Sequence, residues 1–249
     1  MTENVARRTV MGIAASMTAI PMAAIATTAT TAARAATEKP EKIAVIGTGN
    51  VGGTLGKVWS GLGHTVIYGS RTPDSEKMKA LLAESPNAAS ALPAEAAAKS
   101  DMVLLGIPSA SAVEIVKGLG NLAGKVLIDA TNLLEFKDRR IVEPAECLAD
   151  QIRAVATAAN LVKAFNTTTV KVMADPALSG GRVTIPMAGA SVQSKERIAR
   201  LITAMGLDHI DLGGNDMLRM AEHLGRLYVG FGVQNRPKRL EFQLRTWSA

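Results

Sequence analysis

Ile43-Ala44-Val45-Ile46-Gly47-Thr48-Gly49-Asn50-Val51-Gly52 is the stretch that decides the fold. Four apolar residues predict a strand, and the Gly-x-Gly-x-x-Gly spacing then opens a segment with helical periodicity over residues 51–62. In such a unit Gly47 permits the tight turn, Gly49 lets the backbone approach a pyrophosphate, and Gly52 lets the helix pack closely on the strand. Free amide groups at the helix N-terminus attract the diphosphate. The stretch therefore predicts a dinucleotide site, against the alternative of a glycine-rich turn without a ligand.

The chain after this unit continues to alternate short apolar runs with amphipathic segments. We predict strands over 43–46, 65–68, 102–107, 126–129, 161–164, 182–186 and 209–212. We predict helices over 51–62, 75–83, 94–98, 110–119, 145–158, 191–205 and 216–230. Such alternation predicts the α/β class, a doubly wound parallel sheet of the Rossmann type with a small C-terminal helical or α/β portion. The expected domains are a dinucleotide-binding domain over 41–166 and a smaller C-terminal portion over 167–249 that closes the substrate cleft.

The end of the second predicted strand selects the dinucleotide. NAD sites place Asp or Glu there to bind the ribose hydroxyls, whereas this chain has Gly69-Ser70-Arg71-Thr72 and no acidic residue until Asp74. The Arg71 guanidinium suits a 2′-phosphate, and the Ser70 and Thr72 hydroxyls can add hydrogen bonds. Lys77 can reach the same phosphate from the next helix. The sequence therefore predicts NADP(H) rather than NAD(H), against the alternative of a solvated surface arginine.

Several motifs resemble those of the NADPH-dependent coenzyme F-420 reductase-like family, also called the NADP oxidoreductase, coenzyme F-420-dependent group. The resemblance runs from Lys42 to about Leu224 and rests on these motifs in order: Gly47 to Asn50, Gly63-His64, Gly69 to Arg71, Ile107-Pro108, Gly124 to Asn132, Lys163 to Asn166, Met205 to Leu207, Asp211 to Gly213, and Arg219 to Glu222.

The resemblance implies which residues hold the cofactor. The residues that would hold NADP are Thr48, Gly49, Asn50, Val51, Ser70, Arg71 and Lys77, and those that would border the nicotinamide are Ile107 and Pro108. The family's deazaflavin reductases often carry a bulky aromatic after that proline, where this chain has Ser109. Only 3% of the residues are aromatic, so few rings are left to stack a deazaflavin. The resemblance therefore supports reductase chemistry more strongly than it supports a deazaflavin as the acceptor.

The predicted activity is hydride transfer between nicotinamide C4 and a flavin-like, deazaflavin (coenzyme F-420) or other small redox acceptor. It needs stacked rings and not necessarily a protein acid or base. If the substrate is a carbonyl or imine, His223 or Lys163 is the candidate proton donor. Asn132 and Asn166 follow strand ends, where each either contacts the nicotinamide or substrate or caps a turn. Two other classes stay open: an NADP-dependent dehydrogenase or imine or carbonyl reductase, and a non-catalytic NADP-binding module that senses redox state.

The remaining polar candidates have structural interpretations. His64 lies in a turn far from the strand carboxyl ends and His209 flanks a strand, while Arg219 and Glu222 are spaced for a weak helix pair. Cys147 is the single cysteine, which excludes an internal disulfide and a cysteine-rich metal site, and we expect it to be buried in a helix. The net charge of +6 is scattered, so no nucleic-acid partner is predicted. A small redox substrate is the expected partner, and a homodimer is compatible with the sequence.

The first 36 residues differ in composition from the rest, since they hold 12 Ala and 7 Thr. Arg7-Arg8 precedes an uncharged run over 9–33, and Ala33-Arg34-Ala35 offers a small-x-small cleavage site. This order resembles a twin-arginine (Tat) signal peptide over 1–35 and predicts a periplasmic or secreted protein. A membrane anchor is less favourable because Pro21 interrupts a weakly apolar run, so no stable membrane insertion is expected. An uncleaved cytoplasmic extension is the other alternative.

Overall fold

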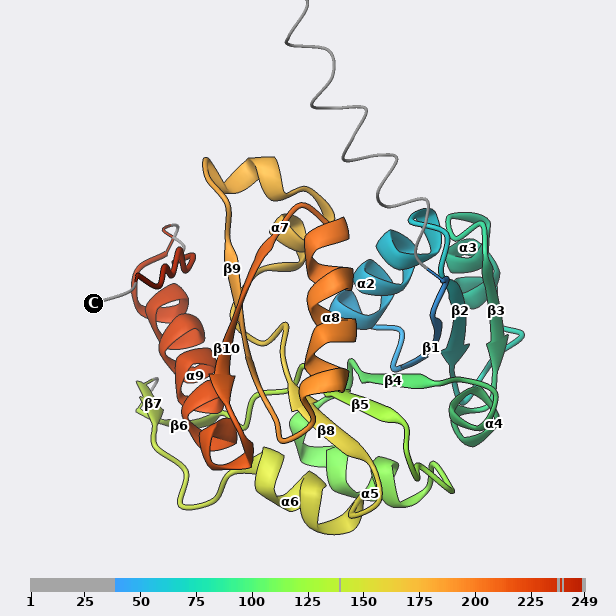
Figure 1. Cartoon of the computed structure of the whole chain (residues 1–249), viewed down its shortest axis with the longest axis horizontal. Helices are drawn as coiled ribbons and strands as arrows, with labels where there is room; N and C mark the ends of the chain where they lie inside the picture. The colour runs from blue at the N-terminus through green and yellow to red at the C-terminus, as the bar shows by residue number, and fades with distance from the viewer. Residues whose placement is uncertain (1–38, 139, 237, 239, 248–249) are drawn as a thin grey trace, which may run out of the picture. The chain divides into compact units, whose positions relative to one another are not determined.

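The computed structural model describes residues 39–138, 140–236, 238 and 240–247. The expected signal peptide over 1–35 lies outside these residues. Residues 40–249 cluster as one compact unit, built on an eight-stranded sheet in the order β10-β9-β8-β5-β4-β1-β2-β3 (Figure 1). Among the described residues, no helix has the length and apolar character that a membrane span requires. The chain therefore folds as the predicted α/β class, with the sheet at its centre.

Six neighbouring strands of the sheet are parallel, as the alternating pattern predicts. The strands of the large sheet are β1 (Lys42–Ile46), β2 (Thr65–Gly69), β3 (Ala88–Ala91), β4 (Met102–Leu105), β5 (Val126–Asp129), β8 (Asn160–Lys163), β9 (Thr184–Ala188) and β10 (Asp208–Gly213). Strand β9 pairs antiparallel with β8, and β10 runs parallel to β9. The physical reason is that no crossover helix returns the chain to the amino edge after β8. It stays at the carboxyl edge through α7 (Val170–Ala174) and a 3-10 turn (Pro176–Ser179), and enters β9 from there.

Helices cover both faces of the sheet, which makes the fold doubly wound. The remaining helices are α2 (Asn50–Gly61), α3 (Glu76–Ala83), α4 (Pro93–Ala98), α5 (Ala112–Lys117), α6 (Leu148–Val155), α8 (Val192–Ala204) and α9 (Leu218–Gln234). One buried apolar cluster joins the sheet to α2, α3, α7 and α8, and the other joins it to α4, α5, α6 and the start of α9. Figure 1 shows α5 and α6 on the opposite side of the strands from α2 and α8.

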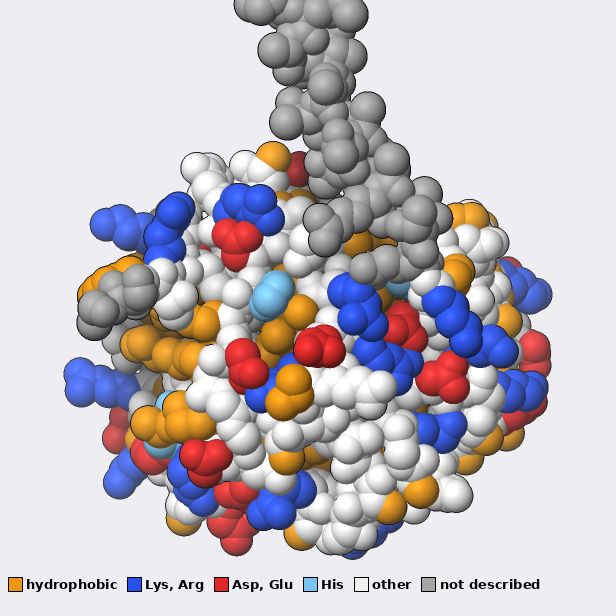
Figure 2. Space-filling view, viewed as in Figure 1, with side chains coloured by type: hydrophobic (Ala, Val, Ile, Leu, Met, Phe, Trp, Pro, Cys, Tyr) orange, Lys and Arg blue, Asp and Glu red, His pale blue; other side chains and the backbone are white. Residues whose placement is uncertain are grey.

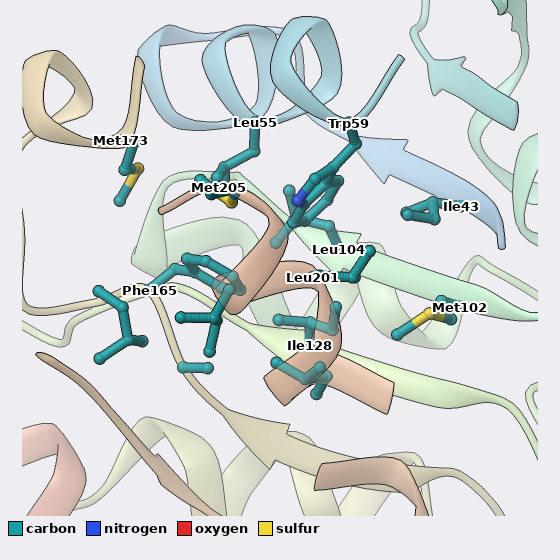
Figure 3. Packing of buried hydrophobic residues seen from close by; sticks show 14 of the residues in the cluster. Ile43, Leu55, Trp59, Met102, Leu104, Ile128, Phe165, Met173, Leu201 and Met205 are labelled. Atoms are coloured by element: carbon teal, nitrogen blue, oxygen red, sulfur yellow. The ribbon is translucent and has the colours of Figure 1, made fainter. Parts of the chain in front are cut away.

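Two of the largest buried side chains meet between α2 and the end of β8. Trp59 and Phe165 are buried, and their ring centroids lie 5.7 Å apart at an interplanar angle of 72°, an edge-to-face arrangement (Figure 3). Phe165 has a φ of +61°, a left-handed conformation that costs a non-glycine residue roughly 1–3 kcal/mol. This strain lies in the turn after β8, where the chain leaves the sheet and the candidate site begins.

The sequence patterns do not predict some elements of the structure, or predict them with different bounds. Strand β3 consists of Ala and Ser, which have weak strand preference, and its pairing with β2 decides its conformation. The short hairpin of β6 (Glu135–Lys137) and β7 (Arg140–Val142) is mostly exposed and lacks a periodic apolar face. Helix α6 begins three residues later than predicted, because Cys147 is an extended residue just before its first turn. Cys147 is buried, as expected, but lies at the helix N-cap.

The visible surface mixes charges of both signs. Figure 2 shows Lys and Arg side chains interspersed with Asp and Glu side chains on this face. Charged side chains are also paired within the chain, for example Lys57 with Glu84 and Arg197 with Glu41. Basic side chains on this face are thus interrupted by acidic ones rather than gathered in one patch.

Candidate functional site

The glycine turn between β1 and α2 is locked by contacts that no side chain would allow. Gly47 has a φ of +91°, and a Cβ there would lie 2.5 Å from the carbonyl oxygen of Gly106. A Cβ at Gly52 would lie 1.9 Å from the carbonyl oxygen of Gly47, and one at Gly106 would lie 2.9 Å from the Gly52 Cα. The three glycines therefore bring the β1–α2 turn and the end of β4 into direct backbone contact, which only glycine permits.

The same turn is open on the side where a ligand would approach. A Cβ at Gly49 would meet no atom of the described residues within 4 Å, in contrast to Gly47 and Gly52. Gly49 is the N-cap of α2 and offers no side-chain cap, and the first turn of the helix contains no acidic residue. The leading amides and the positive end of the helix dipole thus remain for an anion. This arrangement fits a pyrophosphate resting against Gly49.

The end of β2 lies beside this turn, since β1 and β2 are paired in register up to Ile46 and Gly69. Ser70 Oγ accepts a hydrogen bond of 3.1 Å from the Thr72 amide, which holds the segment in a tight turn. Arg71, Thr72 and Lys77 are exposed. Arg71 and Thr72 lie in the loop that follows β2, and Lys77 lies in the first turn of α3. Because all three side chains are exposed, they can turn toward a ligand without breaking a buried contact.

The end of β4 continues the carboxyl edge of the sheet beside the glycine turn. Ile107 is half-buried, and its Cγ2 atom would lie 2.7 Å from a Cβ at Gly47, so it packs directly against the glycine turn. Pro108 is exposed and precedes a 3-10 turn that starts at Ser109. The small residue at 109 leaves this part of the edge without an aromatic ring.

Asn132 and Asn166 form a reciprocal amide pair between the loops that follow β5 and β8. Asn132 Nδ2 donates to the Asn166 carbonyl oxygen at 2.9 Å, and Asn166 Nδ2 donates to Asn132 Oδ1 at 3.0 Å and to the Ala221 carbonyl oxygen at 2.9 Å. A Cβ at Gly225 would lie 2.0 Å from Asn132 Oδ1, so α9 can cross this pair only because it has a glycine there. The pair ties together both loops and the last helix.

The structure places Lys163 differently from the proton donor considered above. Its side chain is fully buried and pairs with Asp129 Oδ2 at 2.7 Å and with Glu222 Oε2 at 3.4 Å. It also donates to the Thr131 carbonyl oxygen at 2.7 Å. Because a charge held between two carboxylates is neither mobile nor accessible, its burial argues against proton donation to a substrate.

Glu222 points inward and does not form the helix pair expected with Arg219. Its oxygens accept from the backbone amides of Leu148 at 3.2 Å and Ala149 at 3.1 Å, so this α9 side chain caps the N-terminus of α6. Burial by itself opposes ionisation of Glu222, but the Lys163 charge and the two amides outweigh it and hold the pKa of this carboxyl below its usual range. Arg219 instead reaches Asp150 at 3.5 Å.

A chain of charges leads from Glu222 to the surface. Arg226 is buried and donates to Glu222 at 3.2 Å and to Glu143 at 2.6 Å. His223 Nε2 lies 2.9 Å from the same Glu143 oxygen, so the one histidine considered for proton donation is held beside a carboxylate and a guanidinium. His64, expected to be structural, accepts a 3.1 Å hydrogen bond from the Glu41 amide. In the described part of the chain, no group of three or more His, Cys, Asp or Glu is placed to hold a metal ion.

Sequence reasoning missed the role of Asp129, Glu222 and Arg226. One signal was present, because Asp129 and Lys163 each follow a buried apolar run at the end of a strand, and a charged residue in a buried strand requires a partner. The strands β5 and β8 are neighbours in which Asp129 and Lys163 lie in register. Glu222 and Arg226 lie four residues apart on α9, and only the docking of that helix places them against the sheet.

Comparison with known proteins gives consistent results. The family model of the coenzyme F420-dependent NADP oxidoreductases matches residues 42–133. A candidate F420-dependent NADP reductase from Arthrobacter sp. FB24 is 32% identical, with a TM-score of 0.69 over 77% of this chain and 93% of that chain. A reductive aminase from Aspergillus terreus, 20% identical with a TM-score of 0.58, covers 79% of this chain and 62% of its own, and shares the fold.

A curated relative comes from a longer protein. The metalloreductase STEAP3 of Rattus norvegicus is 25% identical over 182 residues, which are 73% of this chain and 36% of the relative. The chain thus spans little more than a third of the length of that protein. Together with the glycine turn, the Ser70-Arg71 end of β2 and the 32% identity to a solved reductase, these matches show that the chain belongs to the coenzyme F420-dependent NADP oxidoreductase family.

Proposed function

We propose that this NADP-dependent oxidoreductase transfers a hydride between nicotinamide C4 and a flavin-like, deazaflavin or other small redox acceptor. The observation that carries the proposal is the contrast within the glycine turn, where Gly47 and Gly52 are locked by backbone contacts while Gly49 faces open space. A turn held this rigidly, with one open glycine at a helix N-terminus, is what close contact with a pyrophosphate requires.

The residues proposed to hold NADP extend along the carboxyl edge of the sheet. Thr48, Gly49, Asn50 and Val51 would meet the pyrophosphate with backbone amides, and Ser70, Arg71, Thr72 and Lys77 would bind the 2′-phosphate. Ile107, Pro108 and Ser109 would border the nicotinamide. When bound, the nicotinamide supplies the hydride, and the protein's part is to align the two rings and exclude water.

Cofactor selection can be tested at Arg71, which we propose binds the 2′-phosphate. Arg71→Ala should weaken NADPH binding far more than NADH binding, because only NADPH carries the phosphate that the guanidinium would pair with. Lys79→Ala is the matched control, since Lys79 is an exposed cation of the same region that already pairs with Glu76 at 2.7 Å. Equal losses for NADPH and NADH in Arg71→Ala would contradict the assignment.

The acceptor can be identified by rapid kinetics. NADPH-loaded protein is mixed with a flavin, a deazaflavin, a quinone or a ferric complex, and loss of the nicotinamide absorbance is followed. Oxidation by a flat-ring acceptor is the expected result. Tight NADPH binding without oxidation by any acceptor would instead favour a non-catalytic NADP-binding module, and oxidation only by a carbonyl or imine would favour the reductases of those substrates.

We further propose that residues 1–35 are a twin-arginine signal and that the protein is exported. The support is the order of Arg7-Arg8, the uncharged run and the Ala33-Arg34-Ala35 site. Cell fractionation with N-terminal sequencing tests it, and an intact leader on cytosolic protein would overturn it. Residues 167–249 are proposed to close the substrate cleft. A homodimer is the proposed assembly, which light scattering of the purified protein checks directly.

A further inference from the structure

A cluster of fully buried charges lies at the carboxyl ends of β5 and β8, next in the sheet to β4, whose end is proposed to border the nicotinamide. Asp129, Lys163 and Glu222 have no exposed side-chain surface, and they come from β5, β8 and α9. Asp129 and Lys163 are the last residues of neighbouring strands and lie in register, so both stand at the carboxyl edge. Ion pairs of this kind resist displacement, because moving one member leaves the others buried and unpaired.

Lys163 and Asp129 together fix the loop that follows β5. The Lys163 ammonium donates to the Thr131 carbonyl oxygen at 2.7 Å. Asp129 Oδ1 accepts from both the amide and the hydroxyl of Thr131, at 2.9 and 2.6 Å. Thr131 is therefore held through its carbonyl, its amide and its side chain, and the direction of the chain into Asn132 is determined by these buried charges.

The fixed loop in turn sets the loop after β8 and the last helix. Both polar ends of the Asn132 side chain are engaged by Asn166, and Asn166 also bonds the Ala221 carbonyl oxygen on α9. Glu222, the next residue of α9, returns to Lys163. The contacts thus close a ring: Lys163 to Thr131, Asn132 to Asn166, Ala221 to Glu222, and Glu222 back to Lys163.

We propose that Lys163 is a positioning residue for the nicotinamide half of the cofactor site, acting through this ring of contacts. The inference rests on the proposed function, and it replaces proton donation as the role of Lys163. A rigid support is needed there because hydride transfer is sensitive to displacements of about 1 Å. The adenosine half of the site, at the ends of β1 and β2, contains no member of the ring and is not expected to depend on it.

The test compares a ligand that has a nicotinamide with one that lacks it. The double variant Lys163→Met with Asp129→Asn removes one positive and one negative charge, while Glu222 keeps Arg226 and the α6 amides. The matched control is Lys99→Met with Glu95→Gln, an exposed pair at 2.6 Å at the C-terminal end of α4. Calorimetry gives the Kd values for NADPH and for adenosine 2′,5′-bisphosphate. The fluorescence of bound NADPH reports the environment of the nicotinamide.

In the Lys163 double variant we expect the Kd for NADPH to rise about tenfold, the size of one or two lost hydrogen bonds, and the nicotinamide fluorescence to move toward that of free NADPH. The Kd for adenosine 2′,5′-bisphosphate should stay unchanged, as should all values for the control. Parallel weakening of both ligands, or no change in either, would overturn the inference. If the unmodified protein binds neither ligand, the proposed function itself fails.

A second pair of variants serves if the double variant does not fold. Gly225→Ala places a Cβ 2.0 Å from Asn132 Oδ1 and 2.6 Å from Asn166 Nδ2, and so separates the amide pair without touching a charge. Gly232→Ala is its control on the same helix, because a Cβ there meets no described atom within 4 Å. Gly225→Ala should selectively weaken NADPH binding and shift the nicotinamide fluorescence. If it matches Gly232→Ala in both measurements, the ring does not position the nicotinamide.

Discussion

Glu222 joins three parts of the fold, and its replacement by glutamine should destabilise the protein strongly. The carboxylate belongs to α9, pairs with Lys163 on β8 and accepts the Leu148 and Ala149 amides at the start of α6. Arg226 and the Cys147 thiol are also donors to it. Every one of these partners is a donor, so the amide group of glutamine would bring an N–H2 that faces donors and finds no acceptor among them.

The magnitude follows from complete burial. Removing one member of a buried charge pair leaves the other uncompensated and costs about 3–5 kcal/mol. Each kcal/mol lowers Tm by about 2–4 °C in a domain of this size. Glu222→Gln should therefore lower Tm by roughly 10 °C.

Thermal unfolding followed by circular dichroism measures the effect, with urea unfolding as an independent check. Glu95→Gln is the control. Glu95 makes a 2.6 Å ion pair with Lys99 in which both side chains are exposed, so the substitution should leave Tm unchanged. If Glu222→Gln and Glu95→Gln melt together with the unmodified protein, the buried network does not hold α9 and α6 to the sheet.

The pH dependence has a definite sign. The pKa of Glu222 is lowered in the folded state, so its contribution to stability is present above the unfolded pKa of about 4.3 and is lost as the pH falls through the lower folded value. The Tm difference between the unmodified protein and Glu222→Gln should thus be full at pH 6 and shrink in acid. A difference that stays constant down to pH 3 would show that the charge of Glu222 is not what stabilises the fold.

Two further perturbations follow from the geometry. Gly52→Ala places a Cβ 1.9 Å from the Gly47 carbonyl oxygen, so NADPH affinity and Tm should both fall, with an overpacking cost of about 1–3 kcal/mol. Ligand titration and thermal melting compare it with Gly61→Ala, whose Cβ meets no described atom within 4 Å. If the two variants behave alike, the glycine turn is not locked as the structure indicates. Burial raises the pKa of Glu241, although the hydrogen bonds from Thr168 and Tyr228 act to lower it. The folded state therefore favours the protonated carboxyl. The stability that this carboxyl contributes in acid is lost as the pH rises through its raised folded pKa. Glu241→Gln should therefore raise Tm at pH 7 and lose that advantage in acid below the unfolded pKa; an equal Tm change at both pH values would contradict it.

The sequence alone determined the fold class and the strand–turn–helix geometry of the glycine turn. Gly47, Gly49 and Gly52 follow a strand and open a helix, and the local geometry of such a turn depends on a few adjacent residues. The apolar alternation likewise identified five of the six parallel strands, and the exception is β3, whose small residues carry no pattern of their own. Local sequence suffices for features that are formed by contacts between residues close together in the chain.

Tertiary structure decided the rest, because it depended on contacts between distant residues. The direction of β9 depends on the chain remaining at the carboxyl edge after β8, which residue propensities do not encode. The roles of Lys163 and Glu222 depend on the docking of α9 across the sheet edge. Glu222 lies on that helix, 59 residues after Lys163 in the chain. A lysine considered for chemistry became a buried support once its two carboxylate partners were in place, since burial and pairing, and not residue type, determine what an ionisable group can do.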